Sequence, residues 1–276
     1  MASLHASHSS LFTSHFSLLT FHFSLYMLPL ISALLPAIVL IAFIYFKDKK
    51  NPEPTWQLVK GVIYGCVSAL VAVTFATPSS ILLMMMPGAG GTIFGAFWQS
   101  FLGAAIPEEC AKLLMLWLLL RRNPYYDEHF DGIVYAVCVG MGFAGFENIL
   151  YVVQNMDDWV SVSVARAIFS VPGHFFFAVS MGYFYSCVHF HTASTPREHR
   201  INQIGVILVP IVLHGLFDFF LFVTDLQITF ISSICFILFL ILCCYIAKLG
   251  TRRIKHLLEM DDDPNADAEV AEFEEI

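Results

Sequence analysis

Long runs of apolar residues, separated by short polar segments, dominate the chain. A helix needs about 20 mostly apolar residues to cross a bilayer. Runs of sufficient length lie at residues 28–46, 57–77, 92–120, 132–153, 160–190, 203–224 and 227–248. The pattern therefore predicts an all-α, polytopic membrane helix bundle of about seven transmembrane helices.

Basic residues flank these runs at alternate ends. They flank the first, third and fifth loops and the C-terminus, as Lys47, Lys49, Lys50, Lys60, Arg121, Arg122, Arg197, Arg200, Lys248, Arg252, Arg253 and Lys255. Because basic loops are retained in the cytoplasm, this pattern predicts an N-terminus outside and a cytoplasmic C-terminus. An even number of spans would contradict that orientation.

The composition agrees with a membrane protein. Hydrophobic residues make up 58% of the chain and charged residues only 13%, which excludes a soluble domain. The seven cysteines lie within apolar runs, so they are expected to be buried rather than paired in disulfides. The expected surroundings are the lipid bilayer. No nucleic-acid partner is expected, and no feature predicts an oligomeric state.

The two ends of the chain differ from the apolar middle. Residues 27–250 are predicted to form the membrane-embedded domain. Residues 1–26 have no basic n-region and no cleavage site, so they either precede the true start at Met27 or form an irregular outer extension. Residues 251–276 are acidic towards their end and are expected to form a disordered cytoplasmic tail.

Ionisable side chains inside the apolar runs are the main functional signal, because they are costly to bury in a membrane. The rise of a helix places one group of them at a shared depth of about 16–24 Å from the cytoplasmic end. This group contains Glu108, Glu147, His174, His214 and Asp218. Their convergence near the midplane predicts a buried, water-accessible catalytic chamber. Taken singly, each histidine has the simpler explanation of a hydrogen bond to a backbone carbonyl.

Helical spacing also predicts which of these side chains share a face of their helix. Glu108 shares a face with Lys112, and His214 shares a face with Asp218. Glu109 points about 100° away from Glu108, so one glutamate can activate water while the other orients a neighbour or pairs with Lys112. Arg166 lies at a depth similar to that of Glu147, and an internal ion pair between them is expected.

Carboxylates and imidazoles in such a chamber suit hydrolysis. A glutamate can take a proton from water, and histidines can stabilise an oxyanion. Glu108, His174 and His214 could instead bind zinc, but HExxH is absent and the ligands come from separate helices, so no cofactor is favoured. The match to GxGxxG at residues 140–145 lies in an apolar run without a preceding strand, and such small residues favour close helix packing instead.

Five motifs follow one another in order along most of residues 27–250. They are the segment 47–54, Glu108-Glu109-x-x-Lys112, the segment 130–136 leading to Gly142-Phe143-Ala144-x-x-Glu147-Asn148, Pro172-Gly173-His174, and His214-Gly215-Leu216-Phe217-Asp218. The ordered set resembles the PrsW-type intramembrane proteases, which are related to CAAX-processing and bacteriocin-processing membrane proteases.

This resemblance implies membrane-embedded proteolysis of a single-span membrane protein, such as a membrane-anchored anti-sigma factor, in a bacterial cytoplasmic membrane. It implies Glu108 as general base beside Glu109, His174 as its partner, and His214 with Asp218 near the oxyanion. The expected supporting residues are Lys112, Glu147, Asn148 and Arg166.

The chain also departs from the CAAX-type pattern of Glu-Glu-x-x-x-Arg and His-x-x-x-Asn. Lys112 comes one position earlier than the arginine, and Asp218 replaces the asparagine. An ionised Asp cannot donate a hydrogen bond to an oxyanion, so Asp218 can instead serve to orient His214.

The competing class is a proton-coupled transporter or channel, in which midplane Glu, His, Asp and Lys form a relay. Inverted repeats would support it, but the sequence shows no convincing internal duplication. Among the outer loops, residues 78–91 are expected to be long enough to take part in gating.

Overall fold

The computed structural model describes residues 27–48, 51–226 and 228–262, and its regular structure over these ranges is entirely helical. The N-terminal helix spans Met27–Tyr45. The elements that follow are α2 (Thr55–Met84), α3 (Ile93–Trp98), η1 (Gln99–Ala105), α4 (Ile106–Leu120), α5 (Asp131–Gln154), η2 (Met156–Asp158), α6 (Trp159–Ala165), η3 (Arg166–Ser170), α7 (Val171–His189), α8 (Pro196–Asp225) and α9 (Thr229–Asp262).

Among the described residues, six helices are long and apolar enough to cross a membrane. The predicted span at residues 92–120 is also helical, as α3, η1 and α4, but it is not one of these six. It carries the charged residues Glu108, Glu109 and Lys112. The all-helical, polytopic membrane architecture is thus confirmed, while seven crossings and their orientation stay predictions.

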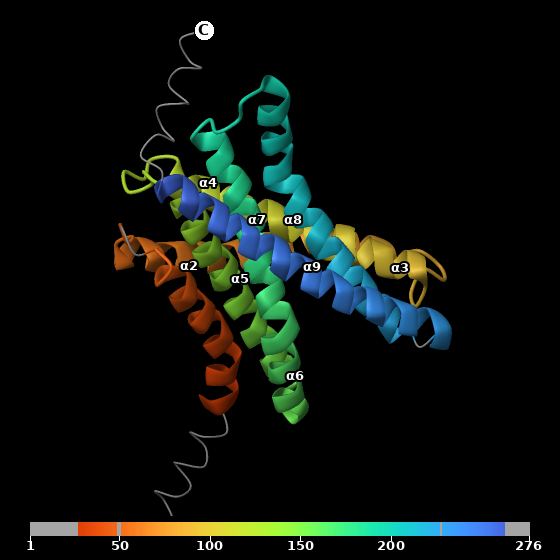
Figure 1. Ribbon diagram of the computed structural model, residues 1–276. Coiled ribbons are helices and arrows are strands. Elements are labelled where there is room, and N and C mark those ends of the chain that lie inside the picture. The colour runs from red at the N-terminus through yellow and green to blue at the C-terminus, as the bar shows by residue number, and fades with distance from the viewer. Residues whose placement is uncertain (1–26, 49–50, 227, 263–276) are drawn as a thin grey trace, which may run out of the picture.

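The helices alternate in direction, and they splay apart towards one side: the joined ends of α8 and α9 lie at the right of the view, whereas α5 and α6 meet at the bottom (Figure 1). Contacts between distant segments hold the opposite end together. Gln57 at the start of α2 donates a hydrogen bond to Asn123 after α4 (2.6 Å), and His129 before α5 contacts Asp261 at the end of α9 (2.7 Å). This is the end that the basic residues predict to be cytoplasmic.

Helix α5 lies at the centre of the bundle between α2 and α7, and all its residues from Asp131 to Gly145 are buried. A Cβ atom at Gly142 would lie 2.2 Å from the carbonyl oxygen of Val62 in α2, and one at Gly140 would lie 2.6 Å from Cβ of Ala178 in α7. These glycines let the helices approach closely, as the sequence predicts.

Two helices are longer than expected. Helix α2 continues through Pro78 to Met84, so the predicted outer loop at 78–91 begins seven residues later, after α2 ends. Helix α9 continues beyond residue 250 to Asp262, so residues 251–262 are helical rather than tail. The extension of α9 is held by tertiary contacts, because Ile254 and Leu257 are buried in the core. Residues 1–26 and 263–276 lie outside the described residues.

Buried acidic side chains at the predicted cytoplasmic end accept hydrogen bonds from neighbouring segments. Asp131 accepts hydrogen bonds from the backbone N–H groups of Asp127 (3.1 Å) and Glu128 (2.8 Å), and the hydroxyl of Tyr135 donates to Glu53. Glu53 is only 4% exposed. Burial raises the pKa of the Glu53 carboxyl to about 7.

The raised pKa of Glu53 predicts that stability depends on pH. The folded protein holds this proton more tightly than the unfolded chain, whose glutamate has a pKa of 4.5. This contribution to stability is therefore full below about pH 4.5 and is lost as pH rises through about 7. We expect the melting temperature in detergent to fall between about pH 5.5 and pH 8. The fall is expected to be smaller in Glu53→Gln, which can still accept the Tyr135 hydrogen bond; an equal fall in both proteins would contradict this account.

Candidate active site

Two π-helical segments present the central polar residues. Segment η1 runs directly into the first turn of α4, which carries Glu108 and Glu109, and η3 runs into α7, which carries His174. Each π-helical segment is followed by a proline, Pro107 or Pro172. Because proline lacks an N–H group and its ring crowds the preceding turn, it disfavours a regular α-helix at that point. A wider π-helical turn accommodates it, and such turns are frequent at functional sites.

Lys112 joins the two glutamates. Its Nζ lies 2.8 Å from Oε1 of Glu109 and 3.4 Å from Oε2 of Glu108. The same ammonium lies 3.9 Å from the ring centroid of Phe143, in a cation–π contact. Glu109 is fully buried, and its Oε1 also lies 2.9 Å from Nδ1 of His214. Glu109 and Lys112 therefore form the buried ion pair that a charge in this setting requires.

The hydrogen bonds of His174 define its tautomer. Its Nδ1 lies 3.2 Å from Nζ of Lys112, and its Nε2 lies 3.1 Å from Oε2 of Glu147. Lysine can only donate, so Nδ1 is the acceptor, and Nε2–H then donates to the carboxylate of Glu147. Glu147 thus orients the imidazole with its Nδ1 towards Lys112.

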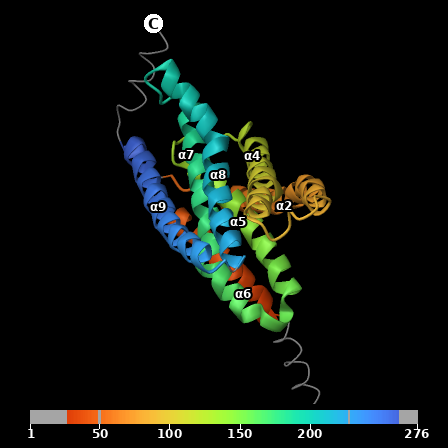
Figure 2. The same cartoon turned by 90° about the vertical axis from the view of Figure 1, so that its right-hand side faces the viewer.

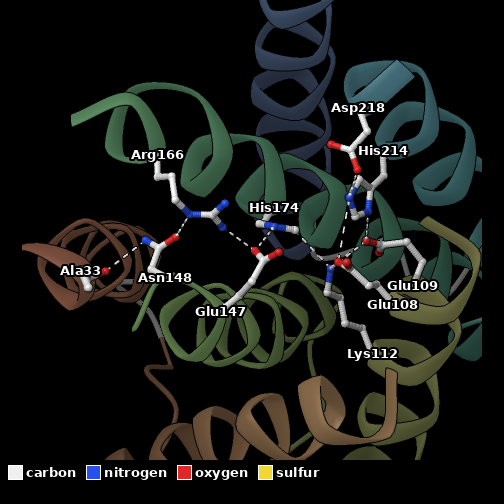
Figure 3. A network of polar contacts seen from close by, with 10 residues as sticks. All are labelled: Ala33, Glu108, Glu109, Lys112, Glu147, Asn148, Arg166, His174, His214 and Asp218. Carbon is white, nitrogen blue, oxygen red and sulfur yellow. Dashed lines mark hydrogen bonds and ion pairs between the residues drawn. The ribbon is translucent and has the colours of Figure 1, made fainter. Parts of the chain in front are cut away.

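A chain of contacts extends from Glu147 to the N-terminal helix (Figure 3). Arg166 donates to Oε2 of Glu147 and to Oδ1 of Asn148, each at 2.5 Å. The amide of Asn148 in turn donates to the carbonyl of Ala33 at 3.0 Å. The expected ion pair between Glu147 and Arg166 is therefore present.

Asp218 completes the network on α8. Its Oδ2 lies 3.3 Å from Nε2 of His214, which is also 3.9 Å from Oε2 of Glu108. The two ring nitrogens of His214 therefore face carboxylates on different helices. Asp218 therefore contacts His214, while its orienting role stays a prediction.

Six residues of the network line a cavity of about 460 Å³. They are Glu108, Glu147, Arg166, His174, His214 and Asp218. Neither Glu109 nor Lys112 is among the lining residues, and the Glu108 side chain is 13% exposed whereas that of Glu109 is not exposed at all. Of the two adjacent glutamates, Glu108 is therefore the one that can meet a water molecule or substrate in the cavity. A larger apolar groove of about 630 Å³ between α4, α7 and α8 contains none of the network residues.

The nine predicted site residues are thus brought together, from α4, α5, η3, α7 and α8. Their parts in catalysis stay predictions. Sequence reasoning missed several aromatic neighbours. Tyr151 packs against the guanidinium of Arg166 at 4.0 Å, and Phe177 stacks on His214 with ring centroids 4.9 Å apart. Tyr151 lies four residues after Glu147, a spacing that could have placed it on the same face. Nothing in the sequence distinguishes Phe177 from other core residues.

The same donors have the chemistry of a metal site. One ligand atom from each of Glu108, Glu109, His174 and His214 lies within 4.8 Å of all the others. Carboxylate oxygens and imidazole nitrogens suit zinc, and Oε2 of Glu109 is buried without a hydrogen-bond partner. The residues therefore fit an ion by type and burial. However, the Lys112 ammonium contacts Glu108, Glu109 and His174, and an ion held by those three groups would have to displace it.

Comparisons with known proteins identify the family. Residues 53–246 match a family model described as "PrsW family intramembrane metalloprotease". The matched region contains the nine site residues, whereas the N-terminal helix precedes it. No solved structure matches the chain.

Three bacterial proteins, each named Protease PrsW, are similar over most of their length. The protein of Oceanobacillus iheyensis is 31% identical over 198 residues, which is 71% of this chain and 84% of that protein. The protein of Bacillus subtilis is 31% identical over 71% of this chain and 84% of its own length, and that of Clostridioides difficile is 30% identical over 69% and 78%. These relatives favour a protease over a transporter or channel. The chain therefore belongs to the PrsW family and is an integral, multi-pass membrane protease.

Proposed function

We propose that this protease is an endopeptidase that cleaves membrane-anchored proteins, with Glu108 as the general base that activates water. The observation that carries the proposal is the unequal placement of the two glutamates. Glu108 faces the cavity, whereas Glu109 is enclosed and bound by Lys112 and His214. Of these two adjacent glutamates, only Glu108 lines the cavity, where a water molecule can meet its carboxylate.

The reaction follows from this placement. Glu108 takes a proton from water as the oxygen attacks the peptide carbonyl, and the protonated Glu108 then supplies a proton to the departing amine. His214 lies beside Glu108 at the cavity wall and can orient the water or stabilise the developing oxyanion. Glu109, Lys112, Glu147 and Asp218 hold the two histidines and Glu108 in position.

The setting of the cavity within a helical membrane bundle supports the proposed substrate class. A single-span membrane protein can bring its backbone to such a site when its helix unwinds locally. By analogy with the PrsW-type family, we propose a membrane-anchored anti-sigma factor as one such substrate.

Zinc-dependent hydrolysis is the alternative mechanism. It is supported by the description of the family as metalloproteases and by the carboxylate and imidazole groups of the site. Glu108, His174 and His214 would hold the ion, which lowers the pKa of a bound water molecule. The position of Lys112 favours the direct form, in which Glu108 activates water without a metal ion, because the Lys112 ammonium already neutralises the carboxylates.

Replacing the base tests this proposal: Glu108→Gln retains the shape of the side chain but cannot take a proton from water. We expect cleavage of a co-reconstituted single-span reporter protein in liposomes to fall by roughly 100-fold or more. The melting temperature should change little. Glu198→Gln is the matched control, because Glu198 lies in the first turn of α8 and caps the backbone outside the cavity. Cleavage by Glu108→Gln at the rate of this control would contradict the assignment.

Metal content and chelation distinguish the direct form from zinc-dependent catalysis. If Glu108 acts directly, the purified protein should contain far less than one equivalent of zinc by mass spectrometry, and EDTA should leave cleavage within about twofold of the untreated rate. The direct form would be wrong if stoichiometric zinc were found, and were lost together with activity in EDTA and in His174→Ala.

A further inference from the structure

A second cavity, on the opposite side of α7 from the catalytic network, combines an apolar wall with two lysines. It has a volume of about 440 Å³ and lies where the N-terminal helix, α7 and α9 meet. Its lining consists of Leu40, Phe43, Lys47, Phe175, Phe176, Thr251, Ile254, Lys255 and Leu258. Figure 2 shows α9 running beside α7, and the rings of Phe43 and Phe175 lie 6.1 Å apart.

The charges of the lining are all of one sign. Lys47 follows the last turn of the N-terminal helix, and its Nζ lies 5.6 Å from the ring centroid of Phe43. Lys255 is exposed and pairs with Glu259 at 3.1 Å, a surface contact that contributes little. An anion with apolar chains would therefore meet ammonium groups at one end of the groove and aromatic and aliphatic side chains along the rest.

We propose that this groove binds one anionic phospholipid, whose phosphate lies between Lys47 and Lys255 and whose acyl chain follows Phe43, Phe175 and Leu258. Three features carry the proposal: the groove lies in a membrane-spanning bundle, it is apolar apart from the lysines and Thr251, and the lysines lie at the end that the flanking basic residues predict to be cytoplasmic. Basic pockets between membrane helices on the cytoplasmic side bind anionic headgroups.

The site would also bear on catalysis, because Phe175 directly follows His174. Phe175 is buried against the N-terminal helix on one face of α7, while His174 contacts Lys112 and Glu147 on another. A lipid seated on Phe175 and Phe176 would hold the turn of α7 that presents His174. The lipid site itself is independent of the proposed catalytic roles.

The test measures the melting temperature of the purified full chain in detergent with added lipid. We expect dioleoylphosphatidylglycerol to raise the melting temperature by roughly 5 °C. Dioleoylphosphatidylcholine and free glycerol phosphate should have little effect. The lipid-dependent rise should be lost in the double variant Lys47→Gln/Lys255→Gln.

Two further variants make the result specific. Arg121→Gln/Arg122→Gln removes the same charge from exposed positions after α4 and should keep the full rise. Thr251→Trp keeps both lysines but fills the groove, and it should lose the rise. The proposal would be overturned by an equal rise in Lys47→Gln/Lys255→Gln, or by an equal effect of phosphatidylcholine or of glycerol phosphate alone.

Discussion

The buried contact between Lys112 and the paired glutamates is the constraint on which the site depends. Two adjacent carboxylates within a membrane bundle require a compensating charge, because an isolated ion there is far from water. Lys112 lies one helical turn after them and contacts both, while its ammonium also lies over the Phe143 ring and beside His174. This cation lowers the free-energy cost of holding two carboxylates side by side in the bundle.

The same contact separates the tasks of two neighbouring, identical side chains. Glu109 is enclosed between Lys112 and His214 and does not line the cavity. Glu108 contacts Lys112 at a longer distance and faces the cavity. The rotation of about 100° per residue in a helix thus gives the Glu-Glu dipeptide one enclosed carboxylate and one that faces the cavity.

Much of this arrangement could be predicted from the sequence, because depth and face follow from regular helical geometry. Apolar runs and flanking basic residues predict the helices, and the shared depth of Glu147 and Arg166 predicts an ion pair that the structure contains. What the sequence did not predict depends on tertiary contacts. Helix α9 continues to Asp262 because its last turns pack in the core, and Asp261 accepts hydrogen bonds from the backbone of His129 and Phe130. The tautomer of His174 likewise follows only once Lys112 is seen beside its Nδ1.

The most direct test of this account is a double-mutant cycle between Glu109 and Lys112, read as the free energy of unfolding of the reconstituted protein. Each single variant, Glu109→Gln or Lys112→Met, leaves a buried charge with too few partners and should lose about 3–5 kcal/mol. The double variant should lose clearly less than the sum, with a coupling energy of at least about 1 kcal/mol. Losses that add within about 0.5 kcal/mol would contradict the claim that this ion pair holds the site together.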